Sequence, residues 1–162
     1  MRRVLVVVTP LLALAAAGGS FAQQSHQHGQ TPHAQPPSAA DGREWVPMPA
    51  PMVERTLANM RDHLAALQDI AEHLGMGHFD VAAQVAEQRL GMSSLGLHGA
   101  HEVASYMPAG MQAAGSAMHR AASQFAVVAK DAAVTGEPLP VFAGLARITS
   151  ACVACHAGYR FK

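Results

Sequence analysis

Aromatic residues are scarce in this sequence, and neither sign of charge is in excess. Phe, Trp and Tyr together supply 5% of the 162 residues, whereas hydrophobic residues supply 50%. A core built largely from alanine and methionine favours closely packed helices over β-sheet. Lys and Arg number 11, as do Asp and Glu, so the formal net charge is zero. Nothing in this balance predicts binding to nucleic acid or to an anionic membrane.

Cysteine is almost absent, and the residue sets of several enzyme classes are missing. The two cysteines, Cys152 and Cys155, both fall in the last eleven residues. In an oxidising compartment the simplest expectation for such a pair is one disulfide. No Ser-His-Asp set, phosphate-binding glycine loop or carboxylate pair is evident, so the sequence does not predict a hydrolase or a nucleotide-dependent enzyme.

The only long hydrophobic run near the N-terminus has the features of a secretory signal peptide. Arg2 and Arg3 precede an apolar stretch from Val4 to Ala17, and Ser20-Phe21-Ala22 offers a small-x-small cleavage site before Gln23. The apolar stretch is too short for a membrane span. Residues 1–22 are therefore predicted to be a cleaved signal peptide, and the mature chain to be periplasmic without stable membrane insertion.

The segment 23–50 lacks apolar periodicity and is rich in Gln, His, Pro, Ser and Ala. Such a composition predicts a disordered linker, with the folded domain spanning residues 51–162. Trp45 is the exception, because it lies in an extended, proline-rich stretch where it either docks on the domain or stays partly exposed.

Beyond the linker, apolar residues recur at steps of three and four, which predicts four helices. The first ends near Gly75, the second runs from about Phe79 to Leu90, the third begins after Pro108, and the last spans roughly residues 140–159. The predicted apolar seam of the first helix is Leu57, Met60, Leu64, Leu67, Ala71 and Leu74. Four helices with such seams and short turns predict an all-α fold, an antiparallel four-helix bundle.

Cys152-Val153-Ala154-Cys155-His156 is a haem-attachment pattern on the last predicted helix. One helical turn lets both thiols join the vinyl groups at one haem edge, and the adjacent imidazole then reaches the iron. The rival interpretations are a disulfide, a redox Cys-x-x-Cys pair and half of a zinc site. A redox pair belongs at a helix N-terminus after a strand, and zinc requires two further ligands at ordinary spacing.

The stretch from Cys152 to Arg160, with the signal peptide and the four predicted helices, resembles cytochrome c-prime and its low-spin relatives. The resemblance covers about residues 51–162. It implies one covalent haem c on Cys152 and Cys155, with His156 as proximal iron ligand and Arg160 near the proximal face. It also implies a haem near one end of the helices, a homodimer, and either binding of nitric oxide or carbon monoxide or electron transfer with a periplasmic redox partner.

Gas binding and electron transfer differ in whether a protein ligand occupies the distal side of the iron. The sequence leaves both possibilities open. Met60 lies on the predicted seam and is a candidate distal ligand, although methionine at such positions is more often core filler. Leu64, one turn later, would instead give an open, apolar distal face. His63 is a further candidate ligand. No convincing distal acid or base is evident, so the sequence predicts a haem protein that is not an enzyme.

Ten histidines and nine methionines raise an alternative function, a periplasmic copper-binding helical bundle. The candidate pairs are His98 with His101, and His73 with His78. His119 follows a seam residue and is interpreted as a surface histidine. In the linker, a loose metal-binding set is offered by His26, His28 and His33.

Overall fold

The computed structural model describes residues 41–161, an all-α unit with five α-helices among these residues. The predicted signal peptide, and the predicted linker as far as residue 40, lie outside the described residues. The elements, in chain order, are β1 (Glu44–Trp45), α1 (Ala50–Gly75), α2 (Phe79–Arg89), the 3₁₀ turn η1 (Met92–Ser94), α3 (Ala100–Ala104), α4 (Ala109–Thr135), α5 (Leu139–Gly158) and β2 (Tyr159–Arg160).

Proline and glycine set the ends of the long helices. The residues just before α1, α4 and α5 are Pro49, Pro108 and Pro138, and proline suits a helix start because the first amides need no acceptor within the helix. Gly136 follows α4 with φ 76°, in the left-handed region that glycine adopts freely. The four predicted helices are confirmed, with boundaries close to those expected.

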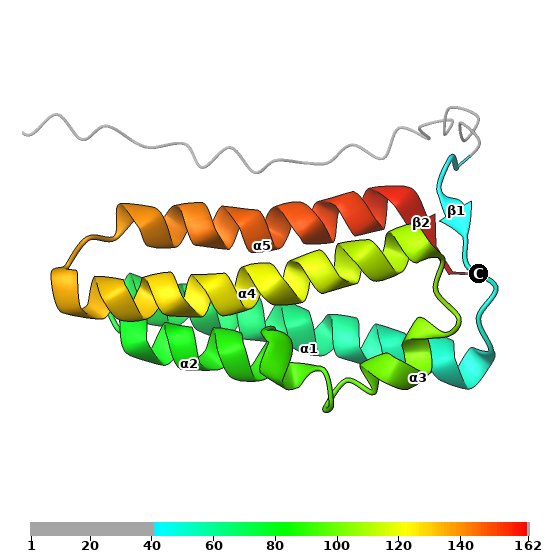
Figure 1. Cartoon of the computed structure of the whole chain (residues 1–162), viewed down its shortest axis with the longest axis horizontal. Coiled ribbons are helices and arrows are strands. Elements are labelled where there is room, and N and C mark those ends of the chain that lie inside the picture. The colour runs from blue at the N-terminus through cyan, green and yellow to red at the C-terminus, as the bar shows by residue number, and fades with distance from the viewer. Residues whose placement is uncertain (1–40, 162) are drawn as a thin grey trace, which may run out of the picture. The chain divides into compact units, whose positions relative to one another are not determined.

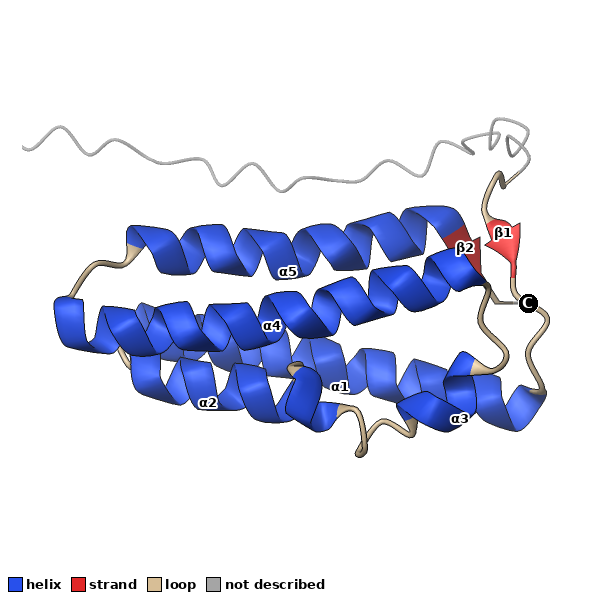
Figure 2. Cartoon of the chain, viewed as in Figure 1, coloured by secondary structure: helices blue, strands red, loops and turns tan. Residues whose placement is uncertain are grey.

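The four long helices lie side by side (Figures 1 and 2). Close packing joins α1 to α2, α2 to α4 and α4 to α5, whereas α1 and α5 approach each other less closely. Small side chains allow this approach, because six of the most buried residues are alanine: Ala66, Ala82, Ala83, Ala86, Ala122 and Ala129. The start of α1, the start of α4 and the end of α5 lie at the same end, beside β1 and β2 (Figure 1).

The predicted apolar seam of α1 is wrong by about one position over much of its length, although Leu74 is buried as predicted and Leu67 packs against the core. Leu57 and Leu64 are 41% and 69% exposed, and the buried residues of α1 are Thr56, His63, Ala66, Ile70 and Leu74. The leucines lie on the flank of the helix, beside the buried face. The misassignment arose because two polar residues, a threonine and a histidine, occupy buried positions that hydrophobic periodicity assigns to solvent.

The end of the predicted linker is also wrong, because residues 44–45 form a strand. β1 pairs in parallel with β2 at the end of the chain, and the Val46 amide donates a hydrogen bond to the Arg160 carbonyl oxygen at 3.0 Å. Val46 is 1% exposed, whereas Trp45 remains half exposed. The residues before α1 therefore lie against the segment that follows the Cys-x-x-Cys-His motif.

The helix α5 is the most apolar of the long helices. Among the described residues it alone is long and apolar enough to cross a membrane, judged by length and composition, and 17% of its apolar window is buried. Those two criteria do not distinguish a membrane span from a helix of a helical domain. The packing of α5 is along α4, through Val141, Gly144 and Ile148.

Candidate cofactor site

A pocket of about 400 Å³ opens beside the end of α5, and it brings together parts of the chain that are far apart in sequence. Its walls come from α1, from α4 and Met107 before it, from the end of α5, from β2 and the residue after it, and from Arg43, which precedes β1. The lining residues are Arg43, Thr56, Leu57, Met60, Met107, Met111, Gly115, Cys155, His156, Tyr159, Arg160 and Phe161.

The C-terminal half of the Cys-x-x-Cys-His motif faces this pocket. Cys155, His156 and Arg160 line it, and Cys152 lies one helical turn earlier, half-buried against the core. Neither cysteine forms a disulfide in the structure. Three of the residues predicted for the site, Cys155, His156 and Arg160, therefore line one pocket, whereas Cys152 is not part of its lining.

The environment of the two thiols does not suit a redox pair. Burial raises the pKa of Cys152 and of Cys155 above the ordinary value of a thiol. Both residues lie in the last turns of α5, where the partial negative charge of the helix end also disfavours a thiolate. Reactive Cys-x-x-Cys sites have lowered thiol pKa values, so this geometry argues against that interpretation.

The two candidate distal residues have different positions. Met60 lines the pocket as expected. Leu64 is 69% exposed and is absent from the lining, so its assignment to the distal pocket is wrong; its place is taken by Leu57, which lies about two turns earlier on the same flank of α1. Two further methionines, Met107 and Met111, line the pocket. Neither was predicted from the sequence to lie on the distal side.

A second arginine joins Arg160 at the pocket, and sequence reasoning missed it. Arg43 lines the pocket because β1 pairs with β2. Its side chain donates hydrogen bonds of 2.9 and 2.7 Å to Asp41, whose pKa it lowers to about 2. The Nε atom of Arg160 lies 3.5 Å from the same carboxylate. No periodicity or motif in the predicted linker marks Arg43.

The side chain of Tyr159 packs against the start of α4, where residue 110 is a glycine. A side-chain carbon built on Gly110 would collide with the hydroxyl of Tyr159, which belongs to β2 and lines the pocket. Glycine costs a helix interior about 1 kcal/mol relative to alanine, so Gly110 has a packing reason to be there.

We expect Gly110→Ala to destabilise the fold by about 1–2 kcal/mol, because overpacking outweighs the gain in helix propensity. The matched variant Gly110→Ala with Tyr159→Phe removes the hydroxyl and should recover at least half of that loss. Urea unfolding followed by circular dichroism measures both. An equal loss in the single and double variants would contradict the predicted collision.

A second pocket, of about 170 Å³, adjoins the first and shares Thr56, Met60, Met107 and Gly115 with it. Three buried histidines line it, each about 8% exposed: His63 of α1, His98 of the loop before α3, and His119 of α4. The predicted surface position of His119 is therefore wrong. Hydrophobic periodicity does not distinguish a buried polar residue from an exposed one beside the seam.

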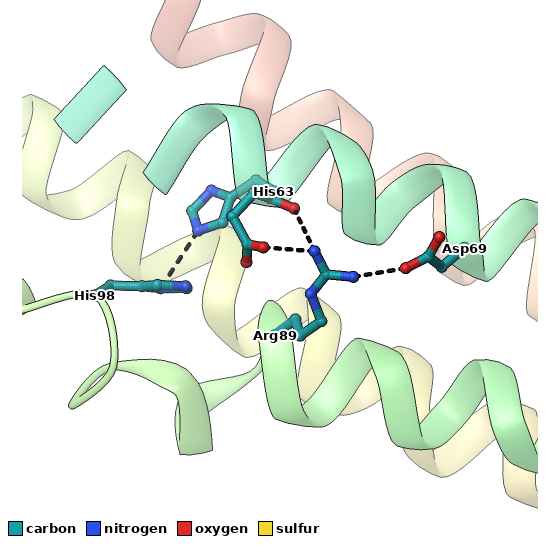
Figure 3. A network of polar contacts seen from close by, with 5 residues as sticks. His63, Asp69, Arg89 and His98 are labelled. Carbon is teal, nitrogen blue, oxygen red and sulfur yellow. Dashed lines mark hydrogen bonds and ion pairs between the residues drawn. The ribbon is translucent and has the colours of Figure 1, made fainter. Parts of the chain in front are cut away.

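The three imidazoles are close neighbours. The Nε2 atom of His63 lies 3.3 Å from Nδ1 of His98, and their ring centres are 4.6 Å apart (Figure 3). The ring of His119 is centred 5.9 Å from that of His63 and 5.8 Å from that of His98. The predicted pairing of His98 with His101 is replaced by this cluster, and His101 is exposed.

Charged residues border the cluster on one side. Arg89 of α2 forms ion pairs with Asp62 and with Asp69, both on α1 (Figure 3). Asp62 lies next to His63 in the chain, and its pKa is lowered mainly by the Arg89 hydrogen bond. Two carboxylates and one guanidinium leave a single negative charge at this edge.

Burial keeps the three imidazoles neutral at pH 7. Burial, and then repulsion from His98 and His119, lowers the pKa of His63 from 6.5 to about 4. Burial is also the main cause of the lowered pKa of His98 and of His119. Asp62 opposes part of these shifts and Arg89 adds to that of His63.

Acidification should therefore destabilise the folded protein. The unfolded chain protonates His63 near pH 6.5 and the folded chain only near 4, so the stability present above about pH 7 is lost as the pH falls. Between pH 7.5 and 4.5 we expect His63 alone to account for about 2–3 kcal/mol. Urea unfolding in the presence of EDTA measures this loss. His63→Gln should flatten the profile, His101→Gln should leave it unchanged, and equal profiles for both would contradict the assignment.

The other predicted metal-binding pair, His73 with His78, is more widely spaced than His63 with His98. The ring centres of His73 and His78 are 6.0 Å apart, at the turn between α1 and α2. Within residues 41–161, no three side chains of His, Cys, Asp or Glu are already arranged as a metal-binding group. The linker histidines His26, His28 and His33 lie outside the described residues.

Comparison with known proteins found no matching family model, no matching curated protein and no matching solved structure.

Proposed function

We propose that the chain is a periplasmic monohaem c-type cytochrome that carries electrons, binds a diatomic gas such as nitric oxide or carbon monoxide, or does both. The observation that carries the proposal is the position of Cys155 and His156 on the wall of a pocket of about 400 Å³. The motif would supply the attachment sulfurs and an iron ligand, and the pocket would supply space beside them.

The residues present fit one haem c. Cys152 and Cys155 lie one turn apart on α5, and each thiol would add across one vinyl group, forming a carbon–sulfur bond while its hydrogen goes to the other vinyl carbon. His156 would be the proximal ligand of the iron. The raised pKa of both thiols and the largely apolar lining agree with an attachment site better than with a redox or zinc site.

The helix arrangement that we propose is an antiparallel four-helix bundle formed by α1, α2, α4 and α5. Turns of three residues join α1 to α2 and α4 to α5, and short turns favour antiparallel neighbours. The side on which α1 and α5 approach less closely includes the pocket. A bound cofactor would fill this side and stabilise the folded state by linkage.

The pocket walls formed by α1, by Met107 and by α4 would give the iron either a thioether ligand or an apolar surface. Met60, Met107 and Met111 line the pocket with Leu57 and Thr56. A methionine ligand would give a low-spin electron carrier with a raised potential, whereas an open face would admit a gas. The lining contains no carboxylate and no imidazole besides His156. Peroxidase-type catalysis needs a distal acid or base, so we propose that the protein is not an enzyme.

The remaining parts of the proposal rest on the sequence. The predicted signal peptide supports a periplasmic location, where an unidentified redox partner protein would exchange electrons with the haem. The resemblance to cytochrome c-prime supports a homodimer. Exposed apolar side chains on α5, such as Phe142 and Val153, are compatible with such a contact.

Absorption spectra of protein matured with a haem-attachment system test the proposal. Ferric and dithionite-reduced samples, with and without carbon monoxide, report attachment, spin state and distal access together. High-spin bands that shift with carbon monoxide would favour gas binding. A low-spin spectrum that carbon monoxide does not change would indicate a protein ligand on the distal side. If carbon monoxide changes the spectrum of Met60→Leu but not that of Met92→Leu, that ligand is Met60. Absence of any haem spectrum would refute the proposal.

A further inference from the structure

We propose that His63, His98 and His119 together bind one divalent transition-metal ion, with Zn²⁺ as the reference ion, in the pocket that adjoins the cofactor pocket. Nothing in this inference depends on the haem. It rests on the positions of three buried imidazoles that three separate parts of the chain bring to one small pocket.

Two of the three donors already have the spacing of ligands on one ion. Bonds of 2.0–2.1 Å in a tetrahedral site place two ligand nitrogens about 3.3 Å apart, and Nε2 of His63 lies 3.3 Å from Nδ1 of His98. An N–H···N hydrogen bond joins these two atoms. An ion that binds both nitrogens would take the place of the proton in this hydrogen bond.

The third imidazole is close enough to complete the set. Three imidazoles on one tetrahedral ion have ring centres about 5 Å apart. The ring of His119 is 5.9 and 5.8 Å from the other two, so it must approach by on the order of 1 Å. A shift of this size is what the three side chains need to form a closed metal-binding group.

The backbone orients His119 for this role. Its Nδ1 atom lies 2.7 Å from the Leu90 carbonyl oxygen, which can only accept, so Nδ1 carries the proton and donates it. The lone pair is then on Nε2, the other ring nitrogen. A ligand histidine typically donates its second N–H to a carbonyl or carboxylate in this way, which fixes the tautomer and the ring.

The loop that carries His98 is also held in place. The side-chain amide of Asn59, on α1, donates a 2.8 Å hydrogen bond to the His98 carbonyl oxygen. The same helix supplies His63 one turn later, so a single stretch of α1 both bears one ligand and positions another. Preorganised ligands reduce the ordering cost of binding.

Charge and burial favour a cation at this place. Metal-binding histidines are neutral imidazoles, and the three rings are buried, each about 8% exposed. The negative charge left by Asp62, Asp69 and Arg89 lies next to His63 and partly offsets the ion. Three histidines and an adjoining pocket of about 170 Å³ leave the fourth position for water or a small ligand.

Zinc content and calorimetry on the full-length mature protein test the site. The reference variant replaces His26, His28 and His33 with glutamine, which removes loose binding by the linker. We expect it to retain one equivalent of Zn²⁺ through dialysis and to gain thermal stability with added Zn²⁺. Loss of an outer-shell partner weakens metal sites by roughly 10–100-fold, so His119→Gln in this background should weaken binding by at least roughly 100-fold. The matched control His101→Gln should leave the affinity unchanged.

X-ray absorption at the zinc edge is measured on the reference variant, in which the three clustered histidines are unchanged. It therefore tests the site even if His119→Gln fails to fold. Three imidazole nitrogens at 2.0–2.1 Å are expected. No retained zinc, sulfur ligands, or equal affinity in His119→Gln and His101→Gln would overturn the proposal. So would a change in the visible haem spectrum of His63→Gln combined with no zinc binding, because His63 would then be an iron ligand. The haem spectrum of each sample reports separately on the cytochrome proposal.

Discussion

Replacing Cys152 and Cys155 together with alanine should abolish covalent haem attachment completely. The two residues are the only cysteines in the chain, so no other thiol can form a thioether. Any haem that remains would be held by His156 and by contacts in the pocket, and acidified organic solvent would extract it. Mass spectrometry of the denatured protein, with the absorption spectrum of the extracted phase, measures this outcome.

The single variants and a matched control sharpen this result. Cys152→Ala and Cys155→Ala should each retain one attachment site and give a lower yield of haem protein. Val153→Ala changes an exposed residue between the two cysteines, 67% exposed, and should leave haem content unchanged. Covalent haem in the double variant would contradict the proposed attachment.

The second large effect is expected in the core between α4 and α5. Phe125 is fully buried, and its ring lies 3.2 Å from where a side-chain carbon on Gly144 would be. Phe125→Ala would leave a cavity at this contact between α4 and α5, at a cost of about 3–5 kcal/mol. This is a large share of the 5–15 kcal/mol by which domains are typically stable.

Chemical unfolding by urea, followed by circular dichroism, measures the Phe125→Ala effect on haem-loaded protein. The matched control is Val134→Ala, at a position on α4 that is 88% exposed. It should change the free energy of unfolding by about 0.5 kcal/mol or less. A loss below about 1 kcal/mol for Phe125→Ala would mean that this interface does not carry the stability assigned to it.

The sequence predicted the helices well because their signals are local. Prolines precede α1, α4 and α5, and Gly136 follows α4, so each boundary is marked by the backbone preference of one residue. The interior face of α4, where Met111, Met118 and Phe125 are buried, follows the same spacing of three and four residues. These features do not depend on which other element the helix contacts.

The candidate site was predictable only in part, because most of its walls come from distant segments. The Cys-x-x-Cys-His motif and the pocket position of Met60 were foreseen. The roles of Arg43, Met107 and Met111 depend on tertiary packing and on pairing between β1 and β2, which leaves no periodic trace in the linker. Leu64 was misassigned because Thr56 and His63 define the buried face of α1.

The histidine cluster was missed for the same physical reason. His63, His98 and His119 are separated by 35 and 21 positions in the chain, and only the packing of α1, α4 and the loop before α3 joins them. Spacing within one segment instead suggested His98 with His101. A buried imidazole beside a seam looks, in sequence, like a solvent-exposed one.

The mass of the native polypeptide, isolated from its source cells and denatured before measurement, tests the central claim most directly. We predict a mass equal to the chain from Gln23 onward plus one haem, together with a Soret band that stays with the protein through acidified organic solvent. A mass equal to the amino acids alone, with no Soret band, would contradict the account.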